Sequence, residues 1–266
     1  MTSDPKKISF KKFKAPPLGK VPVNILIPNF LTLIALCSGF SAVQFALLEN
    51  WEFAAISIFI AALFDGLDGR IARLIGGASR FGAELDSLSD FVSFGVAPSL
   101  VIYFYSLNQL GKWGWIGALF FTVACALRLA RFNTLSIEGD TKKTFSPVWA
   151  TKFFLGVPVP AGAAIALLPL LIELETEFSI HLSPFIYLII LIISGLLMIS
   201  HIHTYAFKSL HLHRRLILPS FVGIGLLVAG FITNPWLTLI IAGILYLISI
   251  PFSDLEYRNL LKKSQN

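Results

Sequence analysis

Four aspartates stand beside or within segments that are otherwise apolar enough to cross a lipid bilayer. Asp65 and Asp68 lie three residues apart, and Asp86 and Asp90 lie four apart, so on helices each pair projects from one face. A carboxylate at membrane depth is costly without a partner, and four acids together require cations. Oxygen ligands on two facing helices suit Mg²⁺ or Mn²⁺, which leave coordination positions for substrate phosphates. The spacing therefore predicts a divalent-metal site.

Small residues and an arginine follow the first pair of acids. Gly69 and Ala72 lead to Arg73, and small side chains let a bulky ligand approach the helix backbone closely. The guanidinium of Arg73 can hold a phosphate through two hydrogen bonds. One aspartate can deprotonate an incoming hydroxyl, because a carboxylate near metal and substrate is a usable general base. These residues alone indicate metal-dependent phosphoryl transfer on a lipid diphosphate at the membrane surface.

The composition is that of a polytopic membrane protein. Of the 266 residues, 56% are hydrophobic and only 14% are charged, whereas a soluble domain is about a quarter charged. The formal charge of +6 does not call for nucleic acid as a partner, because lysine and arginine gather beside membrane spans. Cys37 and Cys125 both lie in apolar stretches, so we expect them to serve as small hydrophobic residues.

The apolar stretches predict an all-α fold, a bundle of about eight transmembrane helices. A span needs roughly 20 apolar residues, and the predicted ranges are about 24–48, 52–75, 86–106, 114–134, 154–173, 184–202, 216–232 and 236–253. The last two are short, so six or seven spans are the alternative. Basic loops stay in the cytoplasm. Both termini are therefore expected there, with the loops 76–80, 140–152 and 201–215.

The acids, the small residues and the arginine belong to one longer pattern. It reads Asp65-x-x-Asp68-Gly69-x-x-Ala72-Arg73 and, after eight further residues, Gly82-x-x-x-Asp86-x-x-x-Asp90. This pattern resembles the full signature of the CDP-alcohol phosphatidyltransferase family, with every fixed position present at the expected spacing. Such a match is far more specific than a lone glycine motif. Further stretches resemble the bacterial, membrane-embedded members that use serine: 28–32, 86–98, 127–133 and 156–163.

The resemblance implies a role for each residue of the signature. Asp65, Asp68, Asp86 and Asp90 would hold a divalent-metal centre, with two ions expected, and Asp90 would also be the general base. The residues implied in binding CDP-diacylglycerol are Asn29, Asp68, Gly69, Ala72, Arg73 and Gly82. The implied reaction is attack by the hydroxyl of L-serine on the phosphorus nearer diacylglycerol, with CMP leaving.

Serine brings a carboxylate, which favours a fork-shaped cation as its partner. We expect Arg131 to fill this role first, then Arg128, with Asn133 as a polar contact. Alternatively, both arginines extend to the membrane surface and set the orientation of the protein in the membrane, with this end in the cytoplasm. Within the family, choline, inositol or glycerol 3-phosphate is the alternative acceptor. Outside it, a divalent-cation transporter is disfavoured, because the acids gather at one membrane face and Arg73 would repel cations.

The chain is expected to divide into four segments. These are a basic interfacial segment (1–22), the family core (23–205), an additional helix pair (206–253) and a cytoplasmic tail (254–266). We expect the histidines of the 201–213 loop to contact anionic lipid rather than metal. The resemblance also implies a homodimer in the bacterial inner membrane, with the active site facing the cytoplasm.

Overall fold

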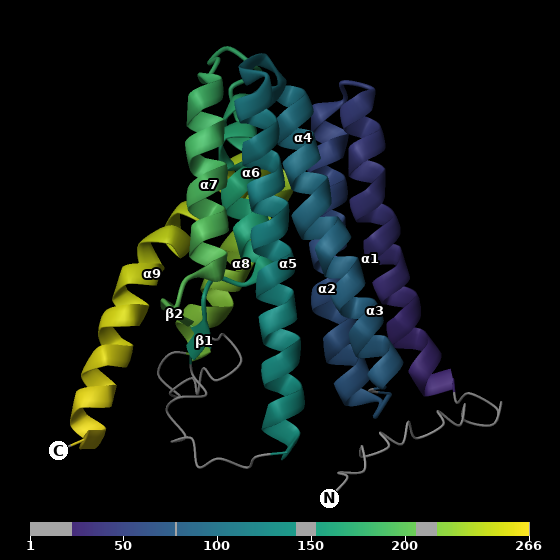
Figure 1. The fold of residues 1–266 in the computed structure, drawn as a ribbon, viewed down its shortest axis with the longest axis vertical. Helices are drawn as coiled ribbons and strands as arrows, with labels where there is room; N and C mark the ends of the chain where they lie inside the picture. The colour runs from purple at the N-terminus through teal and green to yellow at the C-terminus, as the bar shows by residue number, and fades with distance from the viewer. Residues whose placement is uncertain (1–22, 78, 142–152, 206–216, 266) are drawn as a thin grey trace, which may run out of the picture.

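The apolar stretches of the chain form long helices that run side by side. The computed structural model describes residues 23–77, 79–141, 153–205 and 217–265 (Figure 1). Its helices, in chain order, are α1 (Val23–Leu47), α2 (Trp51–Leu74), α3 (Arg80–Asp90), α4 (Ala97–Tyr105), α5 (Lys112–Thr141), α6 (Val159–Glu175), α7 (Pro184–Ile199), α8 (Ile217–Thr233) and α9 (Pro235–Gln265). The predicted helical bundle is confirmed. The basic segment 1–22, His211 and His213 lie outside the described residues.

Four of the described helical segments are long and apolar enough to cross a membrane. They are Asn24–Leu47, Arg80–Tyr105, Lys112–Thr134 and Pro235–Leu261. Many of their large apolar side chains are exposed, Phe40 and Ile244 among them, as expected of helices that face lipid. The protein is therefore an integral membrane protein. Eight spans stay a prediction, because α2 carries charged residues in its last turns and α6, α7 and α8 have only 17, 16 and 17 residues.

Helix α3 begins at Arg80, earlier than the predicted start at residue 86. Ser79 explains this, since its Oγ accepts a hydrogen bond from the backbone N–H of Gly82 at 2.9 Å and caps the helix. After Asp90 the helix widens into a π-helical segment, Phe91–Val96, before α4. Pro98 lacks the N–H that an α-helix would use at this point. Such π-segments are frequent at functional sites.

A short antiparallel pairing replaces the predicted start of the fifth span. Strand β1 (Phe153–Leu155) pairs with β2 (His203–Tyr205), so the helix predicted to start at about 154 begins only at Val159, and the next helix ends at Ile199, a few residues before the predicted end at about 202. Gly156 turns the chain with a φ of 75°, and its N–H donates to the carbonyl of Ile202 at 2.8 Å. Pro158 then caps α6.

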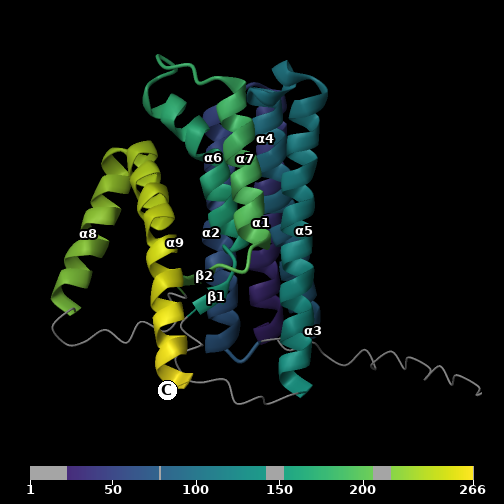
Figure 2. The same cartoon turned by 60° about the vertical axis from the view of Figure 1, so that its left-hand side comes forward.

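Helix α9 links the C-terminal pair to the rest of the bundle. Figure 2 shows α8 standing away from the bundle, while α9 lies beside β1 and β2 and packs on α6. The Tyr205 hydroxyl donates to Glu256 at 2.5 Å, and the His203 ring stacks on Tyr257 with centroids 3.4 Å apart. The bond to Glu256 raises the pKa of Tyr205 to about 12, so Tyr205 remains a donor. We call these interactions the β2–α9 contact.

Two helices continue past the predicted membrane spans. The predicted span at about 114–134 agrees with the apolar segment Lys112–Thr134, but helix α5 itself continues to Thr141, and α9 continues to Gln265, beyond the predicted end at about 253. In α9 the physical reason is the β2–α9 contact. Asp254 accepts from the backbone N–H of His203 at 3.4 Å and pairs with Arg258 at 2.7 Å, and both interactions favour a continued helix.

Candidate active site

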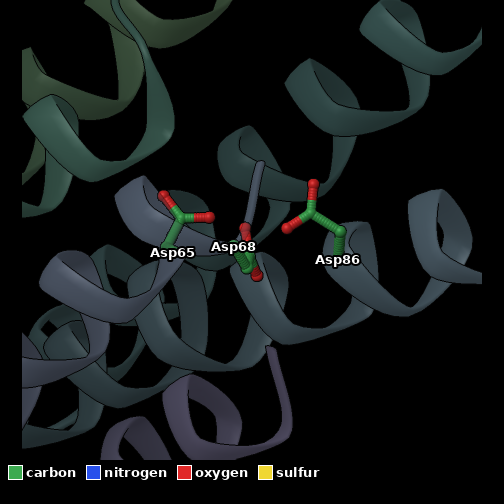
Figure 3. A group of neighbouring side chains, drawn as sticks. All are labelled: Asp65, Asp68 and Asp86. Atoms are coloured by element: carbon green, nitrogen blue, oxygen red, sulfur yellow. The ribbon is translucent and has the colours of Figure 1, made fainter. Parts of the chain in front are cut away.

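Three of the four signature aspartates meet at one end of the bundle. A carboxylate oxygen from each of Asp65, Asp68 and Asp86 lies within 4.8 Å of the other two (Figure 3). We call these three side chains the carboxylate triplet. Asp65 and Asp68 come from the last turns of α2 and Asp86 from α3, so the two predicted pairs face each other across a helical hairpin.

Two glycines make this hairpin tight. Gly76 has a φ of 65°, in the region that favours glycine. A Cβ on Gly77 would lie 2.0 Å from the backbone oxygen of Asn24, so only glycine lets the turn approach α1 this closely. The turn therefore fixes α2 and α3 against α1, and this packing sets the distance between the acids.

The triplet has the properties of a site for a hard cation. Asp68 is buried and accepts a hydrogen bond from Thr32 Oγ1 at 2.6 Å. Asp86 Oδ1 and Asp90 Oδ1 are buried without a hydrogen-bond partner. Within the described part of the chain, no lysine or arginine nitrogen forms an ion pair with any of these four acids. Buried oxygens that lack partners fit Mg²⁺ or Mn²⁺, and Thr32 would orient one ligand.

Asp90 stands at the edge of the triplet. Its carboxylate lies near that of Asp65, but it is not one of the three acids whose oxygens meet within 4.8 Å. It is the last residue of α3, where the π-helical segment begins. Asp90 therefore lies beside the triplet without belonging to it.

A pocket of about 190 Å³ opens beside the triplet, and we call it the hairpin pocket. Its lining contains all six residues predicted to bind CDP-diacylglycerol: Asn29, Asp68, Gly69, Ala72, Arg73 and Gly82. Nothing within 4 Å would meet a Cβ on Gly69, whereas a Cβ on Gly82 would lie 2.7 Å from Asn29 Oδ1. Arg73 is exposed at the pocket. The pocket thus combines an arginine, small residues and two acids of the triplet.

From the sequence alone, no role was assigned to two polar residues of this pocket, Thr32 and Ser79. Thr32 lies in the 28–32 stretch, and its contact with Asp68 joins residues 36 apart in the chain. Ser79 caps α3 and also lines the pocket. The available signal for a cap was Ser79 itself, because serine is among the residues favoured at the N-cap of a helix. No local pattern marked Thr32 as a partner of Asp68.

The residues predicted to bind serine lie in different surroundings. Arg131 donates from Nη1 to the carbonyl of Ile199 at 3.2 Å and from Nη2 to that of Ser200 at 3.3 Å, so its guanidinium caps the end of α7. Asn133 and Ser87 bond to each other, with Asn133 Nδ2 donating at 3.0 Å.

Arg128 differs from Arg131. Its Nε is buried without a hydrogen-bond partner, and its guanidinium is an electrostatic neighbour of Asp90. Of the two predicted arginines, Arg128 is therefore the one that has an unpartnered donor and lies near Asp90.

The chain is similar to known proteins over most of its length. The sequence model of the CDP-alcohol phosphatidyltransferase family matches residues 25–206, and a second model, CDP-alcohol phosphatidyltransferase 2, matches residues 215–251. The chain is 33% identical over 238 residues to the CDP-diacylglycerol–serine O-phosphatidyltransferase of Mycobacterium leprae, covering 89% of this chain and 77% of that protein. The protein of the same name from Helicobacter pylori is 35% identical over 190 residues, which are 71% of this chain and 76% of the relative.

A third relative matches over a shorter stretch. The CDP-diacylglycerol–serine O-phosphatidyltransferase of Mycobacterium tuberculosis is 44% identical over 150 residues, which are 55% of this chain and 50% of the relative. The aligned part thus spans half the length of that protein. The first family model contains the whole signature, the carboxylate triplet and the hairpin pocket. The chain belongs to the CDP-alcohol phosphatidyltransferase family.

Proposed function

We propose that this protein transfers the phosphatidyl group of CDP-diacylglycerol to the hydroxyl of L-serine, releasing CMP and phosphatidylserine. The observation that carries the proposal is that Asp68 and Asp86 each belong both to the carboxylate triplet and to the lining of the hairpin pocket. A site that joins oxygen ligands to an arginine-lined pocket suits a metal-bound diphosphate. The names of the relatives support serine as the acceptor.

The signature acids are the proposed metal ligands. Asp65, Asp68, Asp86 and Asp90 would hold two Mg²⁺ or Mn²⁺ ions. Bound divalent ions would offset the negative charge of the diphosphate and make CMP a better leaving group. Thr32 would keep Asp68 oriented, because its hydroxyl donates to Oδ2.

The protein residues then bind and align the reacting groups. Arg73 holds a phosphate of the CDP moiety at the hairpin pocket, while Gly69, Ala72 and Gly82 let the nucleotide approach the helices, with Asn29 in support. The serine oxygen forms a bond to the phosphorus nearer diacylglycerol as the bond from that phosphorus to the bridging oxygen of CMP breaks. The hydroxyl proton passes to the carboxylate of Asp90. Most of the rate gain comes from positioning and electrostatics.

For the serine carboxylate we propose Arg128 as the direct partner. Its unpartnered Nε and its position near Asp90 support this choice. Arg131, the first choice on sequence grounds, is proposed to act by holding the end of α7 through Ile199 and Ser200. Asn133 supports α3 through Ser87.

We further propose eight spans with both termini in the cytoplasm, and an active site that faces the cytoplasm. The ends of α2, α5 and α9 and the start of α3 lie at one end of the bundle (Figure 1), which supports a common side for the basic loops. The relatives from Mycobacterium and Helicobacter support a bacterial inner membrane. The homodimer and the four-segment division rest on the family resemblance.

The test is CMP release from CDP-diacylglycerol by the purified protein with Mn²⁺ or Mg²⁺. Serine, choline, inositol and glycerol 3-phosphate are offered separately. We expect release with serine alone. Release with another alcohol instead would contradict the assigned acceptor and keep the phosphatidyl transfer. The absence of release with every alcohol would contradict the transfer itself, and Mn²⁺ flux in proteoliposomes without CDP-diacylglycerol would then favour a transporter.

A further inference from the structure

Three buried polar atoms without hydrogen-bond partners come from three different helices. They are Asp90 Oδ1 of α3, Arg128 Nε of α5 and the Tyr246 hydroxyl of α9. Arg128 is an electrostatic neighbour of both Asp90 and Tyr246. Leaving buried polar groups unsatisfied is costly. Their combination therefore indicates a ligand with groups that suit all three.

The Tyr246 side chain is held on the inner side of α9. Its ring lines an apolar pocket of about 230 Å³ with Phe94 and Pro160, and its hydroxyl lies near Thr204. The Thr204 hydroxyl already donates to the carbonyl of Gly156 at 2.9 Å. Thr204 Oγ1 could therefore only accept a hydrogen bond from Tyr246, and the Tyr246 hydroxyl forms no hydrogen bond with any described residue, which leaves its proton available to a ligand.

The β2–α9 contact explains how α9 keeps this position. Tyr205 donates to Glu256, and His203 contacts Asp254 and stacks on Tyr257. These interactions lie two to three turns C-terminal to Tyr246 along the same helix. They join α9 to the strand that carries Thr204, so α9 has a fixed place against the core.

The chemistry of the three atoms matches an amino acid that carries a hydroxyl. The Arg128 Nε–H and the Tyr246 O–H are both donors, as a carboxylate requires, and the charge of Arg128 strengthens the first bond. Asp90 Oδ1 is an acceptor for a hydroxyl. In serine the carboxylate and the hydroxyl are attached to adjacent carbons. One serine molecule can therefore place its carboxylate at Arg128 and Tyr246 and its hydroxyl at Asp90.

We propose that Tyr246 of α9, together with Arg128 of α5, binds the carboxylate of the acceptor serine beside Asp90. The inference rests on the proposed function and deepens it. It makes the C-terminal helix pair part of the acceptor site, and Tyr246 a residue that determines which alcohol is accepted.

The test compares Tyr246→Phe with the parent protein in CMP release, with serine and CDP-diacylglycerol varied in turn. The substitution removes a hydroxyl that has no partner within the described residues, so the thermal unfolding temperature should stay the same. We expect the KM for serine to rise about tenfold, the size of effect of one lost hydrogen bond to a charged group. The kcat and the KM for CDP-diacylglycerol should change less than about twofold, because the hydroxyl contacts neither the nucleotide nor the reacting phosphorus.

Two further variants sharpen the result. Tyr103→Phe is the matched control, since the Tyr103 ring packs on Phe104 of α4 and Trp115 of α5, and all its kinetic constants should equal those of the parent. Arg128→Gln should raise the KM for serine more than Tyr246→Phe does. In the double variant of Tyr246→Phe and Arg128→Gln, the KM for serine should rise by less than the product of the two single fold-changes, because both donors bind the same carboxylate.

The possible failures are distinct. An unchanged KM for serine in Tyr246→Phe, with normal serine-dependent release by the parent, would overturn this inference and leave the proposed function standing, as expected if only a water bridges the three atoms. A rise of equal size in the KM for serine and in the KM for CDP-diacylglycerol, together with a lower unfolding temperature, would also overturn it. Such a result would show that Tyr246 has a structural role. A parent protein without serine-dependent release would overturn the proposed function and this inference with it.

Discussion

At the scale of single residues, the site is a set of acids whose surroundings differ. Asp68 is buried and receives a hydrogen bond from Thr32, while Asp86 and Asp90 each keep an unpartnered oxygen. The spacing of the signature predicted that these acids share one face of a hairpin. It could not predict the partner of Arg131, because the carbonyls of Ile199 and Ser200 lie 68 and 69 residues away in the chain.

The substitution Asp90→Asn tests the general base. An amide cannot take the serine proton, so kcat should fall by a factor on the order of 10² to 10⁴, while equilibrium binding of CDP-diacylglycerol stays largely intact. Glu84→Gln is the matched control, since Glu84 is an exposed acid in the same helix, and it should leave kcat unchanged. If binding falls as far as turnover, Asp90 is chiefly a metal ligand.

The substitution Thr32→Val tests the support of Asp68. Loss of the donor at 2.6 Å should weaken the apparent affinity for Mn²⁺ by roughly 10- to 100-fold, the usual effect of removing a hydrogen bond to a metal ligand. The measurement is the Mn²⁺ concentration at half-maximal CMP release. Thr122→Val provides the comparison, because the Thr122 hydroxyl bonds to Ala118, Ser99 and Gly95 and none of the four acids. An identical Mn²⁺ dependence in both variants would contradict the role of Thr32.

At the scale of helices and strands, the hairpin of α2 and α3 against α1 forms the pocket. Gly82→Ala tests this packing, because the added Cβ would lie 2.7 Å from Asn29 Oδ1 and 3.1 Å from Ser79 Oγ. The KM for CDP-diacylglycerol should rise about tenfold, with a smaller change in the KM for serine. Gly66→Ala is the control, since a Cβ there meets nothing within 4 Å. An equal change in the KM for CDP-diacylglycerol in Gly82→Ala and Gly66→Ala would argue against the close approach of α3 and α1.

The sequence predicted the helices better than their junctions. Apolar runs of span length placed α1, α2, α7 and α8 within a few residues, because hydrophobicity and length are local properties. The start of α6 was missed because Phe153–Leu155 pairs with His203–Tyr205, a contact that depends on the tertiary fold. The extension of α9 follows from the same strand, through Asp254 and Glu256.

At the scale of the whole molecule, two parts of the chain contribute to one end of the bundle. The segment 25–206 holds the triplet and the hairpin pocket, and α9 approaches it through β2. Composition alone predicted a membrane bundle, whereas the return of α9 to the catalytic end had no local sequence signal. The proposed account therefore makes the C-terminal pair a functional part of the enzyme.

Metal removal tests the account of the triplet in the intact protein. Treatment with EDTA should abolish CMP release, because the buried acids would then lack the cations that the diphosphate requires. Added Mg²⁺ or Mn²⁺ should restore it, whereas Ca²⁺, with its longer oxygen distances and more flexible coordination, should restore it less. Full release in EDTA would contradict a metal site at Asp65, Asp68 and Asp86.

The most direct measurement follows isotope-labelled serine into lipid. Purified protein in vesicles that contain CDP-diacylglycerol receives labelled L-serine with Mn²⁺, and the lipid product is identified by mass spectrometry. The account predicts labelled phosphatidylserine and CMP in equal amounts, both absent in EDTA and in Asp90→Asn. CMP without labelled lipid, or labelled lipid that persists in EDTA, would contradict metal-dependent phosphatidyl transfer to serine.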